Sequence, residues 1–321
     1  MHALTRFCIY LHTKYNTAMI KNRLVLIDAF ALIHRAFHAI PPLATADGRL
    51  VNAVYGFTGA LLSAIKELQP EYLAVGIDLP KPTRRKKEYA AYKAHRVPPP
   101  DELKSQIPYV MEMLKIFNIP VFGVEGYEGE DIIATVVAKI KMQKSKCKNI
   151  EFIIVTGDLD LLQLIDDQTK VYAMGRGANE AIIYDKQKVI ERYSLKPEQF
   201  VDFKALKGDV SDNIPGVRGI GEKTAAKLMT DFGSLKNIYE NLEKISGKSH
   251  TLLSENKEQA FLSQKLSKIS TDAPLEFRLE DARIHEYNKA DVIRFFNQLG
   301  FKSLISRLPS EIPNHRQEKL L

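Results

Sequence analysis

From residue 24 onward, short runs rich in valine and isoleucine alternate with longer amphipathic stretches. The candidate strands are residues 24–27, 72–77, 120–124 and 152–155. The candidate helices are residues 53–68, 101–117 and 131–144. Apolar strands separated by helices are typical of β-α-β units around a parallel sheet. We therefore expect an α/β fold with a mostly parallel central sheet flanked by helices, and a site at the carboxyl ends of the strands.

The second half of the chain has a different pattern. A β-hairpin is expected at residues 171–174 and 181–184, with Gly175 and Gly177 in its turn. After residue 184 the chain consists of helical patterns with short connectors, and the last of them covers residues 291–308. The expected division is a disordered extension (1–22), an α/β core (23–205), a helical lobe (206–308) and a frayed tail (309–321).

Net charge, cysteine content and the lengths of the apolar runs limit the classes of protein to which this chain can belong. The formal net charge of +7 is compatible with an acidic polymer as partner, although a mild lysine excess is common in soluble proteins. Two distant cysteines, Cys8 and Cys147, argue against a disulfide framework and a zinc site, and for a reducing compartment. No apolar run is long enough for a membrane span or a signal peptide. We expect a cytoplasmic protein that starts at Met1 or Met19.

Carboxylates follow three of the candidate strands. Asp28, Asp78 and Asp158 each stand at the end of a Val- and Ile-rich run. Parallel strands bring their carboxyl ends to one edge of the sheet, so these side chains are expected to gather there. The remaining acidic candidates stand next to Asp158, at the start of the helix after another strand, and in a glycine-containing loop: Asp160, Glu128, Glu130, Asp131, Asp209 and Asp212.

Such a group of carboxylates is expected to bind metal. Crowded carboxylates repel one another and take up protons unless divalent cations neutralise them. Oxygen ligands with no nearby histidine or cysteine favour Mg²⁺, with Mn²⁺ as the alternative, over Zn²⁺. Two such ions could activate a water molecule and hold a phosphate. A single aspartate after a strand is more often a helix N-cap, but the repetition at successive strand ends favours the metal site.

A basic segment at residues 81–96 follows Asp78 directly. Five of its residues fall at spacings of three and four, which predicts one helical face that grips phosphates and stacks on an unpaired base: Arg85, Tyr89, Tyr92, Lys93 and Arg96. A charge run by itself is more often a solvated helix face. Its position beside the acidic edge favours binding to nucleic acid.

Three glycines lie in a short loop between two helical patterns, an arrangement that predicts a helix-hairpin-helix. Glycines let the backbone approach a phosphate, and amides at the start of the second helix point toward it. The residues expected to contact DNA here are Gly216, Gly219, Gly221, Lys223, Thr224 and Lys227. Such contacts recognise the DNA backbone and not its sequence. The alternative is a plain helical turn with glycine caps.

Several ordered strings carry a resemblance to a known family. They are Val25-Leu-Ile-Asp28, Asn52-Ala-Val-Tyr-Gly-Phe57, Tyr92-Lys-Ala-His-Arg96, Gly126-Tyr-Glu-Gly-Glu-Asp131, Thr156-Gly-Asp-Leu-Asp160, Gly208-Asp-Val-Ser-Asp-Asn-Ile-Pro-Gly216 and Gly219-Ile-Gly-Glu-Lys-Thr224. Together they resemble the 5′ nuclease domain of bacterial DNA polymerase I and, more broadly, the flap endonucleases. The resemblance covers about residues 23–308.

The resemblance implies a PIN-like nuclease core, a helical arch at about residues 81–100 over the active site, and a helix-hairpin-helix lobe. One metal ion would be held by carboxylates at Asp28, Asp78, Glu128, Glu130, Asp131 and Asp158. A second, more weakly bound ion would use Asp160, Asp209 and Asp212. Tyr92, Lys93 and Arg96 match arch residues that engage the 5′ end, Lys93 and Arg96 as part of the catalytic set. Some relatives also bind K⁺ at the hairpin.

This sequence departs from the family pattern at three positions. Glu130 stands where the family usually has Asp, Arg84 where an aromatic residue precedes the arch arginine, and Leu159 where a lysine separates the paired aspartates. These changes bear on rate and metal preference, because Glu130 is longer and Leu159 removes a positive charge.

The resulting hypothesis is a structure-specific 5′→3′ exonuclease and flap endonuclease that uses two metal ions. Its expected partners are DNA with 5′ flaps, nicks or RNA primers and a DNA polymerase, fused or separate. We expect a monomer at the nucleoid that acts in primer removal and repair. One alternative is a catalytically inactive DNA-binding protein, which would require missing ligand positions. The other, a PIN-type ribonuclease, would lack the arch and the glycine hairpin.

Overall fold

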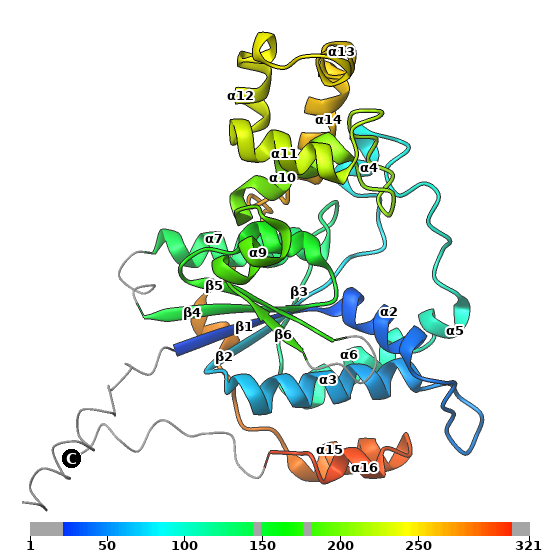
Figure 1. The fold of residues 1–321 in the computed structure, drawn as a ribbon. Helices are drawn as coiled ribbons and strands as arrows, with labels where there is room; N and C mark the ends of the chain where they lie inside the picture. The colour runs from blue at the N-terminus through cyan, green and yellow to red at the C-terminus, as the bar shows by residue number, and fades with distance from the viewer. Residues whose placement is uncertain (1–21, 144–148, 176–180, 310–321) are drawn as a thin grey trace, which may run out of the picture.

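The computed structural model describes residues 22–143, 149–175 and 181–309, and its centre is a six-stranded sheet (Figure 1). The strands are β1 (Asn22–Asp28), β2 (Tyr72–Gly76), β3 (Val121–Phe122), β4 (Ile150–Thr156), β5 (Thr169–Ala173) and β6 (Ile182–Tyr184). Their order is β3-β2-β1-β4-β5-β6, and every pairing is parallel except that of β5 with β6. The expected mostly parallel sheet is confirmed.

Both faces of this sheet are buried, which explains why its strands are continuous apolar runs. Leu24 and Leu26 of β1 face one hydrophobic core, whereas Val25 and Ile27 face the other. The first core lies under α7 (Gly129–Met142) and α9 (Lys186–Tyr193), on the same side as the helical lobe (Figure 1). The second lies under α2 (Ala29–Ala39), α3 (Asn52–Leu68) and α6 (Ile107–Ile116).

The helices expected at residues 53–68, 101–117 and 131–144 are present, with three differences in this part of the chain. Helix α2 was not predicted, although its buried Ala29, Leu32, Ile33 and Ala36 have helical spacing. The single helix expected at 101–117 is two, α5 (Asp101–Lys104) and α6, because Pro108 in the first turn of α6 lacks an N–H for a continuous ladder. Helix α7 begins at Gly129, earlier than residue 131.

The helical lobe consists of α10 (Phe200–Lys207), α11 (Glu222–Phe232), α12 (Leu235–Glu240), α13 (Lys248–Glu255) and α14 (Lys257–Ser267). Contrary to the expected lobe of 206–308, α15 (Lys289–Gln298) and α16 (Lys302–Ile305) pack on the opposite side of the sheet, beyond α3 (Figure 1). Their apolar residues Val292, Phe296 and Leu304 join the core under α3, which holds them there. Short 3₁₀ helices are η1 (Leu159–Leu164), η2 (Pro197–Gln199), η3 (Leu242–Lys244) and η4 (Leu279–Ala282).

The antiparallel hairpin β5-β6 is present as expected. Most of its turn, including Gly177, lies outside the described residues, as do almost all of the expected N-terminal extension and all of the tail beyond Pro309. Among the described helices, none combines the length and the apolar character that crossing a membrane requires.

Candidate active site

The strand order reverses between β1 and β4, and this switch point holds an acidic pocket. Asp28 is the last residue of β1, Asp158 follows β4 by two residues, and Asp78 follows β2 by two residues. A pocket of 580 Å³ is lined by Asp28, Asp78, Glu128, Glu130 and Asp158. Residues from four separate stretches of chain therefore meet as the sequence predicted.

Two of these aspartates also cap helices. Asp28 Oδ1 accepts a hydrogen bond from Ala31 N (3.2 Å) at the start of α2. Asp158 Oδ1 accepts one from Asp160 N (2.9 Å) at the start of η1. The capping role and the place in the acidic pocket thus occur together, since one carboxylate has lone pairs for both.

The carboxylates of α7 lie at its N-terminus, where the helix dipole favours negative charge. Glu128 is the N-cap, and its backbone N–H donates to Asp131 Oδ2 (3.0 Å) in a capping box. Asp78 Oδ1 accepts from Gly129 N (2.9 Å). The strand-end and helix-start carboxylates are thereby held together by backbone contacts.

Crowding and burial make several of these groups resist ionisation. Burial, with Asp78 and Asp158 close by, raises the pKa of Asp28 to about 7, although the Thr156 hydroxyl lowers it. Burial likewise raises the pKa of Asp78 and, well above its usual value, that of Glu130. A pocket of this kind gains stability from bound positive charge.

Arg85 supplies one such charge, but not in the way that the sequence suggested. Its guanidinium is buried and contacts Glu128, Glu130 and Asp131 at 3.2, 3.1 and 2.7 Å. It is therefore occupied inside the protein and does not offer a free phosphate-binding group. Both oxygens of Asp131 are also taken, by Arg85, Glu128 N and Ser270 N, and Asp131 does not line the pocket.

The basic segment does not form the expected continuous helical face. Helix α4 covers only Arg84–Glu88, and turns follow in which Lys93 has a left-handed φ of 52°. Tyr92 is buried and donates from its hydroxyl to Glu128 (3.2 Å) and Asp212 (3.1 Å), while Tyr89 packs beside it. The buried ring of Tyr92 is not free to stack on a base in this structure, whereas that of Tyr89 is only partly buried. Tertiary contacts of Tyr92 outweigh the helical spacing.

Lys93 and Arg96 do lie beside the acidic pocket, as their position in the sequence predicted. Both line it, and Lys93 Nζ contacts Glu128 at 2.7 Å and Asp212 at 3.7 Å. Arg96 pairs with Asp212 and donates from Nε to Ser211 O (3.1 Å). Asp212 is thus neutralised by cations of the basic segment.

Asp160 and Asp209 share a lysine that the sequence analysis missed. Lys204, whose side chain is 6% exposed, contacts Asp160 and, at 2.6 Å, Asp209. The sequence feature that could have indicated a buried cation is the position of this lysine in an apolar stretch of α10, between Phe203 and Ala205. Lys204 supplies a positive charge near the paired aspartates, where Leu159 supplies none.

The donor chemistry of the pocket fits a hard divalent cation. Oxygen atoms of Glu130, Asp158 and Asp160 lie within 4.8 Å of one another, close enough to ligate one ion. The expectation of no nearby histidine was wrong, because His34 of α2 lines the pocket. Burial lowers the pKa of His34, so its ring adds little positive charge.

The glycine hairpin joins α10 to α11 in the lobe. Gly219 and Gly221 are exposed, and Gly221 is the N-cap of α11, so the first amides of this helix point outward. Lys223 and Lys227 are exposed on the same helix. Gly216 differs: a Cβ there would meet Gly208 N at 2.3 Å, and its N–H donates to Ser263 Oγ (3.0 Å). Gly216 therefore serves close backbone packing, and its amide is not available to a phosphate.

Comparison with models of known protein families shows to which family this chain belongs. Residues 23–194 match the model of the 5′-3′ exonuclease N-terminal resolvase-like domain, and residues 195–290 match the 5′-3′ exonuclease C-terminal SAM fold. This chain belongs to the 5′-3′ exonuclease family. Members of this family are nucleases, which hydrolyse phosphodiester bonds. The second domain boundary, at 290, agrees with the separation of α15 and α16 from the lobe.

Curated relatives of this 5′-3′ exonuclease family member are DNA polymerases I. That of Caldicellulosiruptor bescii is 42% identical over 89% of this chain and 33% of its own length. That of Bacillus caldotenax is 39% identical over 94% of this chain and 34% of its own length. The chain therefore spans about a third of the length of these relatives.

Solved structures show the same fold. A T5 5′-exonuclease with bound divalent metal ions (zinc) covers 78% of this chain and 90% of its own, with a TM-score of 0.62 and 24% identity. The catalytic core of Rad2 in complex with DNA substrate covers 89% and 90%, with a TM-score of 0.51 and 16% identity.

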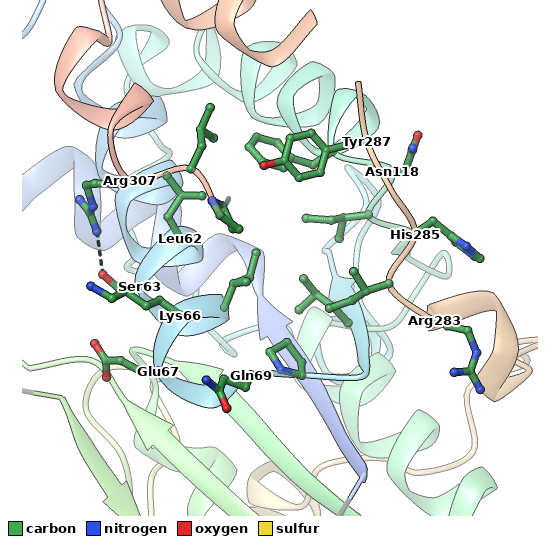
Figure 2. Close-up of a pocket in the computed structure, with 18 of the residues that line it drawn as sticks. Leu62, Ser63, Lys66, Glu67, Gln69, Asn118, Arg283, His285, Tyr287 and Arg307 are labelled. Carbon is green, nitrogen blue, oxygen red and sulfur yellow. Dashed lines mark hydrogen bonds between the residues drawn. The ribbon is translucent and has the colours of Figure 1, made fainter. Parts of the chain in front are cut away.

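A larger pocket, of 660 Å³, lies away from this chemistry. Figure 2 shows it beside α3, where Leu62, Lys66, Arg283 and Arg307 surround it. Glu67 is the one carboxylate among its lining residues. Size alone would select this pocket, but the carboxylates cluster in the smaller pocket at the sheet switch point.

Proposed function

We propose that this chain hydrolyses DNA near 5′ ends, as a divalent-metal-dependent 5′→3′ exonuclease and flap endonuclease. The observation that carries this proposal is the convergence of Asp28, Asp78, Glu128, Glu130 and Asp158 on one pocket. Membership of the 5′-3′ exonuclease family supports it. An inactive DNA-binding protein would have no need of so many carboxylates held against their mutual repulsion.

The pocket carboxylates are proposed to hold Mg²⁺, or Mn²⁺ in its place, because all of them offer oxygen. Bound divalent ions would supply a nucleophile at neutral pH and stabilise charge on the phosphate. Asp160, Asp209 and Asp212 are proposed for a second, weaker position, where an ion would compete with Lys204 and Arg96. Asp131 is proposed to position Arg85 and the start of α7, since its oxygens are occupied.

Lys93 and Arg96 are proposed to bind and orient the phosphate to be cut. Both line the pocket, so a phosphate that enters it meets their charge together with the carboxylates. Arg85 is proposed to support this site from inside, through Glu128 and Glu130. The segment of residues 81–100 would then lie against the 5′ end, beside the opening of the pocket.

The lobe is proposed to hold the duplex through Gly219, Gly221, Lys223, Thr224 and Lys227 at the start of α11. Outward amides at a helix N-terminus and exposed lysines suit a phosphate backbone. A K⁺ ion at this hairpin is part of the same proposal. The T5 flap endonuclease and Rad2 structures, which contain DNA, support binding to DNA by this fold.

The biological role is proposed to be removal of RNA primers and flaps during replication and repair at the nucleoid. The DNA polymerase I relatives support a polymerase as partner, fused or separate. Action as a monomer is part of the proposal, because the pocket is formed within one chain.

The test is cleavage of a 5′-labelled flap and of a nicked duplex, each with Mg²⁺, with Mn²⁺ and with EDTA. We expect cleavage near the flap junction with either ion and none with EDTA. Cleavage that persists in EDTA would refute the role of the metal. Absence of cleavage with every ion, despite DNA binding, would favour an inactive binding protein.

A further inference from the structure

Thr156 is a polar residue buried at the end of the central strand β4. The strand reads Ile-Glu-Phe-Ile-Ile-Val-Thr, and Thr156 has no exposed surface. A hydroxyl group in an apolar strand end is unfavourable unless it is fully hydrogen-bonded, and a valine would fill the same volume without that cost. The hydrogen-bond partners of the Thr156 hydroxyl should therefore explain why a threonine and not a valine stands here.

Both of its partners belong to the acidic pocket. Thr156 Oγ1 donates its proton to Asp28 Oδ2 at 2.7 Å. The same oxygen accepts from the backbone N–H of Asp158 at 2.9 Å. The N–H of Asp158 can only donate, and toward the ionised form of Asp28, which is the form that binds a metal ion, the hydroxyl is the donor.

The hydroxyl therefore links two carboxylate-bearing residues that come from distant parts of the chain. Asp28 and Thr156 are 128 residues apart and meet because β1 and β4 pair in parallel, with Ile27 opposite Val155. Thr156 itself does not line the pocket, whereas Asp28 and Asp158 do. A fully buried β-branched side chain has little freedom to rotate about χ1, so Thr156 is a stiff connection.

We propose that Thr156 is a positioning residue that sets the Asp28 carboxylate and the Asp158 backbone for metal binding by the pocket. This inference rests on the proposed metal-dependent function. Loss of the hydroxyl leaves the Asp158 N–H unpaired and lets the Asp28 carboxylate turn. Groups that orient metal ligands in this way typically change metal affinity by about 10- to 100-fold.

The test is Mn²⁺ binding to the full chain, measured by calorimetry without DNA. We expect Thr156→Val to weaken Mn²⁺ binding by about 10- to 100-fold and Thr156→Ser, which keeps the hydroxyl, to stay within a few-fold of the parent. Thr58→Val is the matched control. Thr58 is also fully buried, but its hydroxyl donates to Val54 O within α3 (2.7 Å).

The outcomes separate this inference from the proposed function. If the parent chain binds no Mn²⁺, the metal site itself fails. If the parent binds Mn²⁺ and folded Thr156→Val binds it equally well, only the role of Thr156 is overturned. Should Thr156→Val not fold, the pair Thr156→Ala and Thr156→Ser isolates the hydroxyl, and equal affinities of these two variants would overturn the inference.

Discussion

At the scale of the residue, Lys204 joins two carboxylates through one buried ammonium group. Its Nζ contacts Asp160 and Asp209, and although burial raises the pKa of Asp209, Lys204 lowers it below the usual range. Burial raises the pKa of Asp160 to about 6, although the charge of Lys204 lowers it. The three charges depend on one another, since none is well solvated.

Replacing Lys204 by methionine leaves two carboxylates without their cation. We expect Lys204→Met to lose about 3–5 kcal/mol in the free energy of unfolding in EDTA. Added Mn²⁺ should restore part of this loss, because the ion binds only the folded chain. Urea denaturation measures both effects, with Lys207→Met, on the exposed side of the same helix, as control. Equal urea midpoints for Lys204→Met and the parent would contradict this account of the site.

Single residues also show what a sequence can predict of a site. Asp28, Asp78 and Asp158 were predictable, because each follows an apolar run whose end must lie at one edge of a parallel sheet. Arg85 and Lys204 were not, because a long cationic side chain can reach several partners and only the fold decides among them.

At the scale of the element, α11 presents its N-terminus and its lysines to solvent. Lys223 is exposed in the first turn, close to the outward amides after Gly221. Lys236 of α12 is also exposed, but it pairs with Glu240 at 3.5 Å. The two lysines therefore allow a comparison between a predicted phosphate contact and a general surface charge.

We expect Lys223→Ala to weaken binding to flap DNA and to reduce the salt dependence of the binding constant. One lost phosphate contact lowers the slope of log K against log salt by roughly 0.9. Fluorescence anisotropy at several salt concentrations, in Ca²⁺ or EDTA, measures this slope. Lys236→Ala should keep the parent slope. A parent-like slope for Lys223→Ala would exclude a phosphate contact there.

Elements also differ in how well their sequence predicts them. The sheet and helices α3 and α7 follow periodic patterns, so the sequence predicts them to within a few residues. The segment after α4 does not, because Tyr92 and Lys93 are held by Glu128 and Asp212 from other parts of the chain. Contacts between residues that are far apart in the sequence cannot be predicted from the spacing of neighbouring residues.

At the scale of the whole molecule, the core domain and the lobe share one hydrophobic core. Leu26 and Phe152 of the sheet belong to the same buried cluster as Leu228 and Leu235 of the lobe. The chain leaving α14 is also tied to the acidic site: Ser270 N donates to Asp131 (2.8 Å) and Arg85 donates to Lys268 O (3.1 Å). The lobe is thus connected to the acidic pocket by direct hydrogen bonds.

A shared core predicts that the two parts unfold together. The chain has no tryptophan, so Phe37→Trp in α2 and Phe261→Trp in α14 each provide a single local probe. We expect both probes and far-ultraviolet circular dichroism to give the same urea midpoint. A separate, earlier transition of the Phe261→Trp probe would show that the lobe unfolds independently.

The carboxylates at the sheet switch point are proposed to hold the metal ions on which cleavage depends. Asp158→Asn tests this proposal most directly, because the amide oxygen can keep the hydrogen bond to Asp160 N while the charge is removed. With Mg²⁺ and a 5′-labelled flap, we expect the rate of cleavage to fall by more than about 100-fold. Loss of a residue that only orients a metal ligand typically costs about 10- to 100-fold, and Asp158 is proposed to be a ligand itself. Flap binding, measured by anisotropy, should stay close to that of the parent. Cleavage by Asp158→Asn near the parent rate would show that the Asp158 carboxylate is not needed for the reaction.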